Sequence, residues 1–241
     1  MEKLTHPHVD GGTLNWIVPV SRCAFWEPEA SADSPKMPDV PFIEPSLRRR
    51  LSLFARMSLK VAHDCAGDMS GIRIVFASRH GDLTRTTSML LDLADKELLS
   101  PTTFSMSVLN ACIGIYSIAK KELSPSTALA AGDSSLGYGL LEACMQLTAE
   151  PTTPVLFIYA DEPAPGIYGI ENEDIQTPLA LAILLESNAN AWILCETEPA
   201  QSTIKFPSQP HAFLECLRNK KDARWHGAHQ LWKWSWHERA N

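Results

Sequence analysis

Apolar and polar positions along the chain follow two periods, which together predict both strands and helices. Runs that are apolar throughout, typical of strands buried on both faces, occupy residues 71–78, 153–162, 178–187 and 191–198. Shorter strands are predicted at residues 14–20, where Pro19 stands near the end, and at 126–131. Apolar spacings of three and four predict helices over residues 46–62, 83–98, 108–122 and 134–147. Strands that alternate with helices indicate an α/β fold with a layered mixed sheet covered by helices.

Two segments depart from this alternation. Residues 25–45 carry five prolines among small polar residues, which predicts an irregular excursion over the surface. Near the end, Trp232, Trp234 and Trp236 alternate with polar side chains, the period of a half-buried strand. We therefore expect a single domain over residues 1–241, with a Pro-rich excursion at 25–45 and a Trp-rich tail at 215–241.

Composition narrows the class of protein. The 241 residues are 45% hydrophobic and 20% charged, enough to bury a sizeable core. A net charge of -7 argues against a nucleic-acid surface, which needs a clustered basic face. No apolar run reaches the length of a membrane span, and the first residues do not resemble a signal peptide. The six scattered cysteines suit reduced, buried thiols, so a cytoplasmic protein is expected.

The turn after the strand at 126–131 is the first candidate site. Gly132, Asp133, Ser134 and Ser135 lie between a strand and a helix, where many enzymes hold a nucleophile. The stretch lacks the second glycine of a G-x-S-x-G elbow, and an aspartate at a helix start is usually an N-cap. We therefore interpret Asp133 as a cap. A serine thioester hydrolase or acyltransferase, with Ser134 or Ser135 as nucleophile and His80 as base, stays open as an alternative.

Other reactive side chains have simpler interpretations. His226 and His229 are three residues apart but lack a carboxylate or cysteine at a supporting spacing, so no metal site is predicted. Cys112 lies within an apolar helical repeat and is expected to pack there. The run Arg48–Arg50 is expected to be a solvated helix start, and no glycine-rich phosphate loop occurs. The sequence therefore predicts no cofactor.

The segment from residue 100 to 143 resembles the N-terminal half of β-ketoacyl synthases, enzymes of the thiolase fold. Ser100-Pro101, Asn110 and Pro125 stand where that family has a serine-proline pair, an asparagine before an apolar helix, and the proline before the nucleophile strand. Matched from Pro125, the catalytic cysteine of the family falls on Asp133. The likeness extends over residues 40–185. The two catalytic histidines and the glycine-rich loop of the C-terminal half have no counterpart in this sequence.

The resemblance implies half of a thiolase-like fold without condensing activity, since a carboxylate cannot form the acyl thioester. The chain looks like the short chain length factors of aryl polyene-type, type II polyketide systems. Such a subunit would pair with a full-length ketosynthase as a heterodimer, meet acyl carrier protein transiently, and help to shape the acyl tunnel. The residues implied at the tunnel or interface are Thr103, Phe104, Met106, Asn110, Thr127, Ala128, Leu129, Ala130, Ala131, Gly132, Asp133 and Ser134.

Two further functions stay open beside this one. The chain could be a homodimeric scaffold that binds an acidic acyl carrier protein through a basic patch. The candidates for such a patch are sparse: Arg48–Arg50, and the group of Arg218, Lys220, Lys221 and Arg224. The serine hydrolase or acyltransferase is the other alternative.

Overall fold

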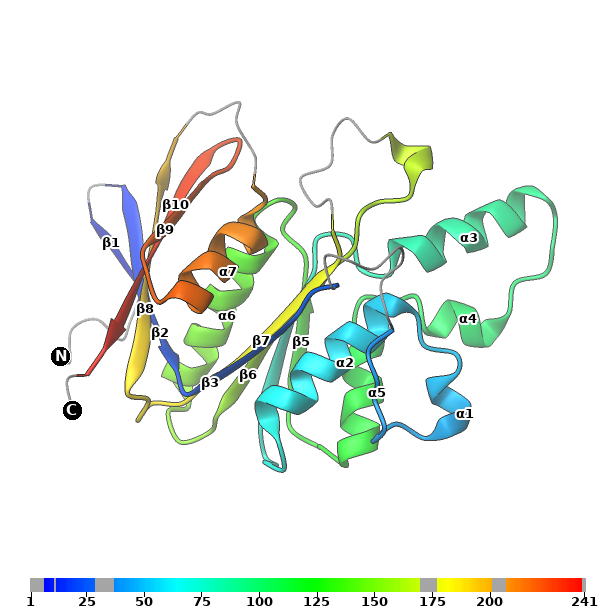
Figure 1. Cartoon of the computed structure of the whole chain (residues 1–241), viewed down its shortest axis with the longest axis horizontal. Coiled ribbons are helices and arrows are strands. Elements are labelled where there is room, and N and C mark those ends of the chain that lie inside the picture. Colours follow the sequence, from blue (N-terminus) through cyan, green and yellow to red (C-terminus); the bar gives the residue numbers. More distant parts are fainter. Residues whose placement is uncertain (1–6, 11, 29–36, 170–176, 201–206, 240–241) are drawn as a thin grey trace.

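The computed structural model describes residues 7–10, 12–28, 37–169, 177–200 and 207–239, which form two five-stranded sheets layered with helices (Figure 1). The chain thus has the α/β fold that the alternation of strands and helices predicts. Its strands divide between two sheets rather than one. Among the described residues, no helix is long and apolar enough to cross a membrane.

One sheet, called the mixed sheet, has the order β3-β7-β6-β4-β5. Its strands are β3 (Arg22–Trp26), β4 (Arg73–Ala77), β5 (Ser126–Leu129), β6 (Val155–Asp161) and β7 (Leu179–Leu185). β6, β4 and β5 are parallel, whereas β3 and β7 run antiparallel to their neighbours. Every residue of β6 and β7 is buried, because helices cover both faces. β5 is an edge strand, with one side paired to β4.

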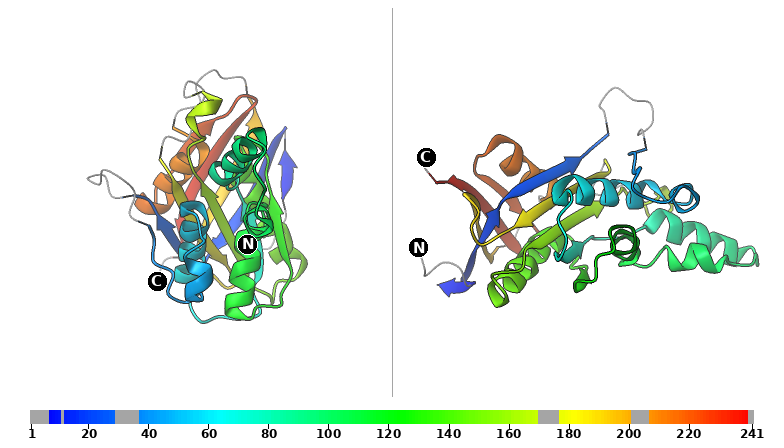
Figure 2. Two further views of the ribbon diagram at one scale, coloured as in Figure 1. Left: turned by 90° about the vertical axis from the view of Figure 1, so that its right-hand side faces the viewer. Right: turned by 90° about the horizontal axis from the view of Figure 1, so that it is seen from below.

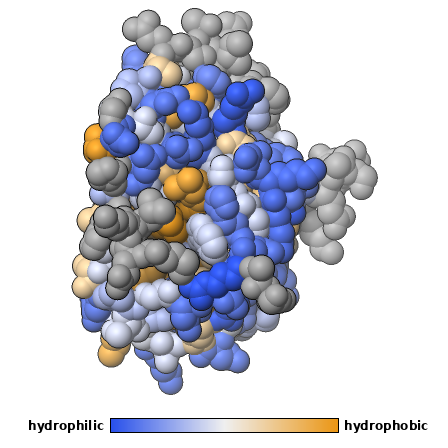
Figure 3. Space-filling view, turned by 90° about the vertical axis from the view of Figure 1, so that its left-hand side faces the viewer, coloured by the Kyte–Doolittle hydropathy of each residue, from blue (hydrophilic) through white to orange (hydrophobic). Residues whose placement is uncertain are grey.

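The other sheet, called the antiparallel sheet, has the order β1-β2-β8-β10-β9. Its strands are β1 (His8–Asp10), β2 (Thr13–Val20), β8 (Ala191–Pro199), β9 (Ala223–His226) and β10 (Gln230–Glu238). Burial alternates along β2, β8 and β10, so only one face of this sheet is covered. Figure 3 views the molecule from this side and shows a largely hydrophilic surface with a small hydrophobic patch.

Helices α6 (Ser135–Ala149) and α7 (Gln209–Asn219) form the layer between the two sheets (Figure 1). Glycines let α6 approach both sheets closely. A Cβ added at Gly137 would lie 2.3 Å from the Trp232 ring of the antiparallel sheet. At Gly139 it would lie 2.6 Å from the Phe157 ring of the mixed sheet. Larger residues at these two positions would therefore push the layers apart.

The opposite face of the mixed sheet is covered by α2 (Leu53–Ala66) and α5 (Ala111–Lys120). The short helix α1 (Pro45–Arg48) precedes α2, and a 3-10 turn, η1 (Gly166–Tyr168), follows β6. Helices α3 (Leu83–Ala94) and α4 (Pro101–Ser105) project away from the layered body (Figures 1 and 2).

Several expected elements differ from the structure. The helix expected over 46–62 is two helices, because the chain turns after α1 and Ser52 caps α2, its Oγ accepting from the Ala55 amide at 3.1 Å. The excursion at 25–45 begins later, since β3 includes Phe25 and Trp26. Val40 and Ile43 are 0% and 1% exposed, so they belong to the core and not to the surface. Residues 191–198 alternate in burial rather than being buried throughout.

Candidate functional site

The turn between β5 and α6 lies at the carboxyl end of the parallel strands, where α/β sheets usually place their sites. Gly132 adopts a left-handed backbone with φ of 58°, which glycine tolerates without strain. Ser135 holds the turn closed: its Oγ donates to the Gly132 carbonyl at 2.7 Å, and the Ala131 amide donates to it at 2.8 Å. Since Ser135 is fully buried, its hydroxyl is part of the turn rather than an exposed nucleophile.

Asp133 forms an ion pair with Arg79. The Arg79 Nη2 atom lies 2.8 Å from the Asp133 Oδ1 atom, and each side chain is 20% exposed. The residue at the N-cap of α6 is Ser134, which makes no capping hydrogen bond through its side chain. The interpretation of Asp133 as the cap is therefore wrong. A guanidinium is a stronger partner for a half-buried carboxylate than the first amides of a helix, so the ion pair takes this role.

Asp161, at the end of β6, fixes the loop that carries Arg79. Its carboxylate is fully buried and accepts from Ser78 Oγ at 2.8 Å and from the backbone amides of Arg79 and His80 at 2.9 and 3.2 Å. The Tyr159 hydroxyl also donates to it. Burial raises the pKa of Asp161 above its usual range. The loop after β4 is therefore anchored, and Arg79 is aimed at Asp133.

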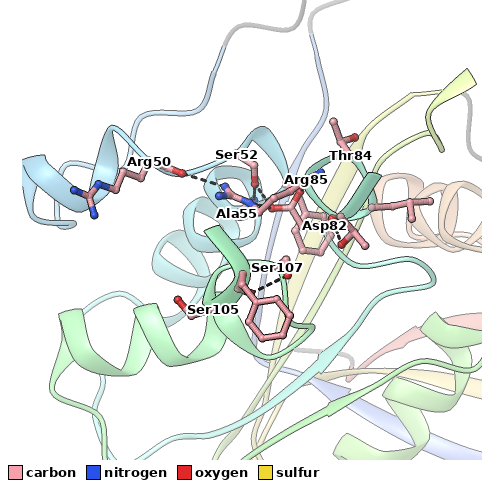
Figure 4. A network of polar contacts seen from close by, with 12 residues as sticks. Arg50, Ser52, Ala55, Asp82, Thr84, Arg85, Ser105 and Ser107 are labelled. Carbon is pink, nitrogen blue, oxygen red and sulfur yellow. Dashed lines mark hydrogen bonds and ion pairs between the residues drawn. The ribbon is translucent and has the colours of Figure 1, made fainter. Parts of the chain in front are cut away.

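A cavity of about 630 Å³ lies beside the start of α3, where the loop after β4 ends. Residues from α2, α3, α4, the loop after β6 and the start of β7 line it: Ser52, Leu53, Asp82, Thr84, Arg85, Ser88, Thr103, Glu162, Pro163 and Pro178. Figure 4 shows polar contacts that join the Arg50 segment with the starts of α2 and α3.

Asp82 is the centre of that network (Figure 4). It is 4% exposed, accepts from Ser52 Oγ at 2.7 Å and pairs with Arg85 Nε at 2.9 Å. Arg85 also donates to the Arg50 carbonyl at 3.0 Å. These contacts tie the starts of α2 and α3 together, so one wall of the cavity is preorganised.

Glu162 also lines the cavity and follows Asp161 directly in the chain. Burial raises the pKa of Glu162 to about 7, and the nearby charge of Asp82 acts in the same direction. The Thr84 hydroxyl of α3 donates to its Oε2 atom over 3.5 Å, which is a long contact. The cavity thus contains a carboxyl group that changes charge near neutral pH.

The tunnel residues implied by the family resemblance lie in several places. Thr103 lines the cavity, whereas Phe104 is 60% exposed on α4 and Met106 packs against the core beneath α5. Asn110 precedes α5 and makes no side-chain capping bond. Residues 127–129 belong to the edge strand β5, and residues 130–134 form its turn. A tunnel role for Phe104 and Met106 stays a prediction.

Exposed apolar side chains are concentrated around α3, α4 and α5. Leu98, Ile118 and Leu123 are 97%, 79% and 96% exposed. Others of this kind are Leu90, Leu91, Leu93, Phe104 and Val108. Exposed apolar side chains and the unpaired side of an edge strand such as β5 are both typical of protein–protein interfaces.

The remaining candidates contribute no site among the residues that the structure describes. No group of three or more potential metal ligands occurs in this part of the chain. His226 lies on β9, and His229 precedes β10. Cys112 is buried, and burial raises its thiol pKa to about 12, so the thiol stays protonated near neutral pH. Arg48 lies 3.8 Å from Asp39 in a surface ion pair.

Sequence reasoning missed five residues of this region: Arg79, Asp82, Arg85, Asp161 and Glu162. A signal exists for four of them, because polar residues stand at the ends of two buried strands, in "SRHGD" at 78–82 and "DE" at 161–162. The carboxyl ends of parallel strands meet at one edge of a sheet, so these residues are brought together.

Comparison with known proteins identifies one matching family and several solved structures with a similar fold. The family described as "Beta-ketoacyl synthase, N-terminal domain" matches residues 24–235. Among solved structures, the complex of the ketosynthase ApeO with its chain length factor ApeC from Xenorhabdus doucetiae matches at 32% identity and a TM-score of 0.71. That match covers 83% of this chain and 83% of the matched chain. No match was found among curated proteins.

Two more distant structures share the fold. The ishigamide ketosynthase/chain length factor is 16% identical, with a TM-score of 0.51, over 74% of this chain and 55% of that chain. A β-ketoacyl synthase from Burkholderia phymatum is 12% identical, with a TM-score of 0.52, over 76% of this chain and 59% of that chain. This chain thus spans little more than half of those two proteins.

Proposed function

Because this chain belongs to the β-ketoacyl synthase N-terminal domain family, we propose that it is a non-catalytic, chain length factor-like subunit. It pairs with a full-length ketosynthase and lines part of the acyl tunnel in polyketide or fatty-acid-like chain elongation. The observation that carries the proposal is the Arg79–Asp133 ion pair at the turn where the family resemblance implies a nucleophilic cysteine.

Condensation needs a thiolate that accepts the acyl group as a thioester. Asp133 supplies a carboxylate instead, and Arg79 neutralises it at 2.8 Å. Cys112 and Cys144 do not replace the thiolate, because both are buried and burial raises both thiol pKa values. The chemistry of the turn therefore supports a subunit that leaves condensation to its partner.

The exposed surface around β5 supports the pairing. An edge strand with a free side is a ready template for a second chain. The exposed apolar side chains on and beside α3, α4 and α5 would also be covered by that partner. A likeness to a chain from a ketosynthase–chain length factor complex, at 32% identity, favours a ketosynthase as that partner. Acyl carrier protein would meet the assembly only transiently, to deliver acyl groups.

The cavity beside α3 and α4 is the best candidate for this chain's share of the acyl tunnel. Its volume of about 630 Å³ is within the range of small-molecule sites. Thr103, one of the residues implied by the resemblance, lines it. Part of the wall is formed by α3 and α4, the helices whose apolar side chains would meet the partner. An acyl chain could then pass from the partner into this chain.

The test is coexpression of this chain with the ketosynthase encoded beside it, with an affinity tag on one subunit only. We expect a one-to-one complex by mass and size analysis, and a poorly behaved chain when it is made alone. A chain that is stable alone and ignores the synthase would overturn the proposal. In that case, labelling by phenylmethylsulfonyl fluoride that is lost in Ser134→Ala would favour the serine hydrolase or acyltransferase.

A further inference from the structure

A second cavity, of about 310 Å³, lies at the end of α6 opposite the turn that carries Asp133. The last residues of α6, strand β2 and the turn between β7 and β8 bound it. α6 has 15 residues and therefore rises about 20 Å between its two ends. This cavity shares no lining residue with the cavity beside α3, so it is a different place on the molecule.

The cavity lies where the antiparallel sheet is narrower. β1 pairs with β2 only at Thr13–Asn15, whereas residues 16–20 pair with β8 on their other side. The end of α6 meets this stretch, and the Cys144 thiol donates to the Ile17 carbonyl at 3.2 Å. Small side chains line the gap and leave it unfilled: Cys144, Thr148, Ala189 and Ala191. An apolar space of this kind gains free energy when an apolar molecule of matching size fills it.

The lining of this cavity is apolar apart from a few groups. Ile17, Leu147 and Trp192 supply apolar surface, and the Trp192 ring stacks on His237 with the ring centroids 5.6 Å apart. Among the described residues that line the cavity, Arg239 alone is charged. The volume is at the lower end of the range of small-molecule sites. The composition therefore fits a small molecule with a hydrocarbon body and one anionic group.

Arg239 is available to such a group. Its side chain is exposed, and its backbone is held because the amide donates to the Asn190 carbonyl at 2.9 Å. The carboxylate of the neighbouring Glu238 pairs with Lys220 at 2.6 Å instead. Within the part of the chain that the structure describes, no carboxylate forms an ion pair with the Arg239 guanidinium. A guanidinium can hold a carboxylate through two parallel hydrogen bonds.

We propose that this cavity binds a small aliphatic carboxylate, with its hydrocarbon chain against the apolar wall and its carboxylate on Arg239. The protein carries a net charge of -7, so its overall field repels anions. A preference for a carboxylate must therefore come from the local guanidinium. The inference goes beyond the proposed function and does not depend on it, because every residue of the lining belongs to this chain.

The experiment measures the binding of three ligands with the same hydrocarbon body, octanoate, octanol and octylamine, by isothermal titration calorimetry. The protein is the complex with the coexpressed ketosynthase, or the chain alone if no complex forms. We expect one site per chain that binds octanoate about threefold to tenfold more tightly than octanol, as a partly exposed ion pair allows. Octylamine should bind there most weakly, because its ammonium meets a like charge.

Three variants locate the site and test its charge. Arg239→Glu should reverse the order of affinities, so that octylamine binds more tightly than octanoate. Ala189→Phe should remove the site for all three ligands, because the added ring would occupy the cavity. Arg224→Glu is the matched control: this arginine is exposed on β9, outside the cavity, and its replacement should leave the order unchanged.

The outcomes separate this inference from the proposed function. No binding of octanoate, equal binding of the three ligands, or an Arg239→Glu variant that keeps the wild-type order overturns the inference and leaves the proposed function intact. A site that persists in a folded Ala189→Phe variant overturns it too. If size analysis shows that Ala189→Phe does not fold, the reversal in Arg239→Glu decides, since that change replaces an exposed side chain. Octanoate binding at this site by a chain that forms no complex would support the inference while the proposed function fails.

Discussion

The two sheets have five strands each but differ in how many of their faces are covered by helices. The mixed sheet has helices on both faces, and β6 and β7 are buried at every residue. The antiparallel sheet has helices on one face, and its strands alternate between buried and partly exposed positions. The burial pattern along a strand therefore shows how many of its faces are covered.

The sheets also differ in what they contribute to the site. β4, β5 and β6 are parallel, so their carboxyl ends bring Arg79, Asp133 and Asp161 to one edge. The described contacts of the antiparallel sheet are mainly with α6 and α7. Its inner face packs Trp16, Trp232 and Trp234 into the core. The mixed sheet therefore positions the charged side chains of the site, and the antiparallel sheet packs against α6, the helix that follows the turn.

The largest expected effect on the free energy of unfolding comes from removing a buried aromatic ring of the mixed sheet. Phe157→Ala in β6 should lower the free energy of unfolding by about 3–5 kcal/mol, because Phe157 is fully buried and the change leaves a cavity. Leu194→Ala, on the outward face of β8, is the control and should cost about 1 kcal/mol or less. Urea unfolding of the purified complex, followed by circular dichroism, measures both. Equal losses would contradict the distinction between the sheets.

The next largest effect on stability is expected in α6, the helix that packs against both sheets. Gly137→Ala should destabilise the fold by about 1–3 kcal/mol, since the added Cβ would lie 2.3 Å from the Trp232 ring. Gly114→Ala in α5 is the control, because nothing lies within 4 Å of its added Cβ. That variant should be neutral or up to about 1 kcal/mol more stable. Thermal unfolding compares the two, and tolerance of Gly137→Ala would show that α6 is not tightly held.

The carboxyl edge of the mixed sheet should make stability depend on pH. The folded protein binds the Glu162 proton more tightly than the unfolded chain, with a pKa of about 7 against a usual 4.5. Stability contributed by this group is therefore complete below pH 4.5 and is lost as pH rises through 7. Glu162→Gln should gain about 1–2 kcal/mol relative to wild type between pH 5 and pH 8, after allowing for its partial exposure.

Unfolding midpoints at several pH values measure that gain. Glu196→Gln, on the antiparallel sheet, controls for the loss of one carboxylate elsewhere. A Glu162→Gln variant that follows the wild-type pH profile in parallel would contradict the assignment.

The smallest effect is expected on the outward face of the antiparallel sheet. Lys233 pairs with Glu198 at 3.0 Å, with side chains 39% and 35% exposed. Lys233→Ala should cost about 0.5 kcal/mol or less, and the cost should disappear in high salt. Urea midpoints at low and high ionic strength provide the measurement. A loss that persists in salt would show that this face is covered in the assembly.

Short-range patterns predicted much of this fold. The continuous apolar run at residues 179–185 predicts a strand that is buried on both faces, and β7 is one. The alternating tryptophans of β10 predict a strand that is buried on one face, as the structure shows. α7 escaped prediction although Phe213 and Leu217 are four residues apart and Pro210 stands in its first turn, a favoured place for proline.

The site was harder to predict because it depends on which strands are neighbours. Arg79 and Asp133 are far apart in sequence, and their ion pair requires β4 and β5 to be adjacent and parallel. Local preference alone favoured Asp133 as a helix cap, and that was wrong. Asp161 similarly acquires its role from the loop that follows a different strand.

The distribution of tryptophan has an optical consequence. Of the seven tryptophans in the chain, Trp26 lies on β3, and the other six lie on the antiparallel sheet: Trp16, Trp192, Trp225, Trp232, Trp234 and Trp236. Ultraviolet emission from this chain therefore comes almost entirely from one sheet. A shift in that emission would signal that the antiparallel sheet has separated from α6, while binding events at the far edge of the mixed sheet would leave it nearly unchanged.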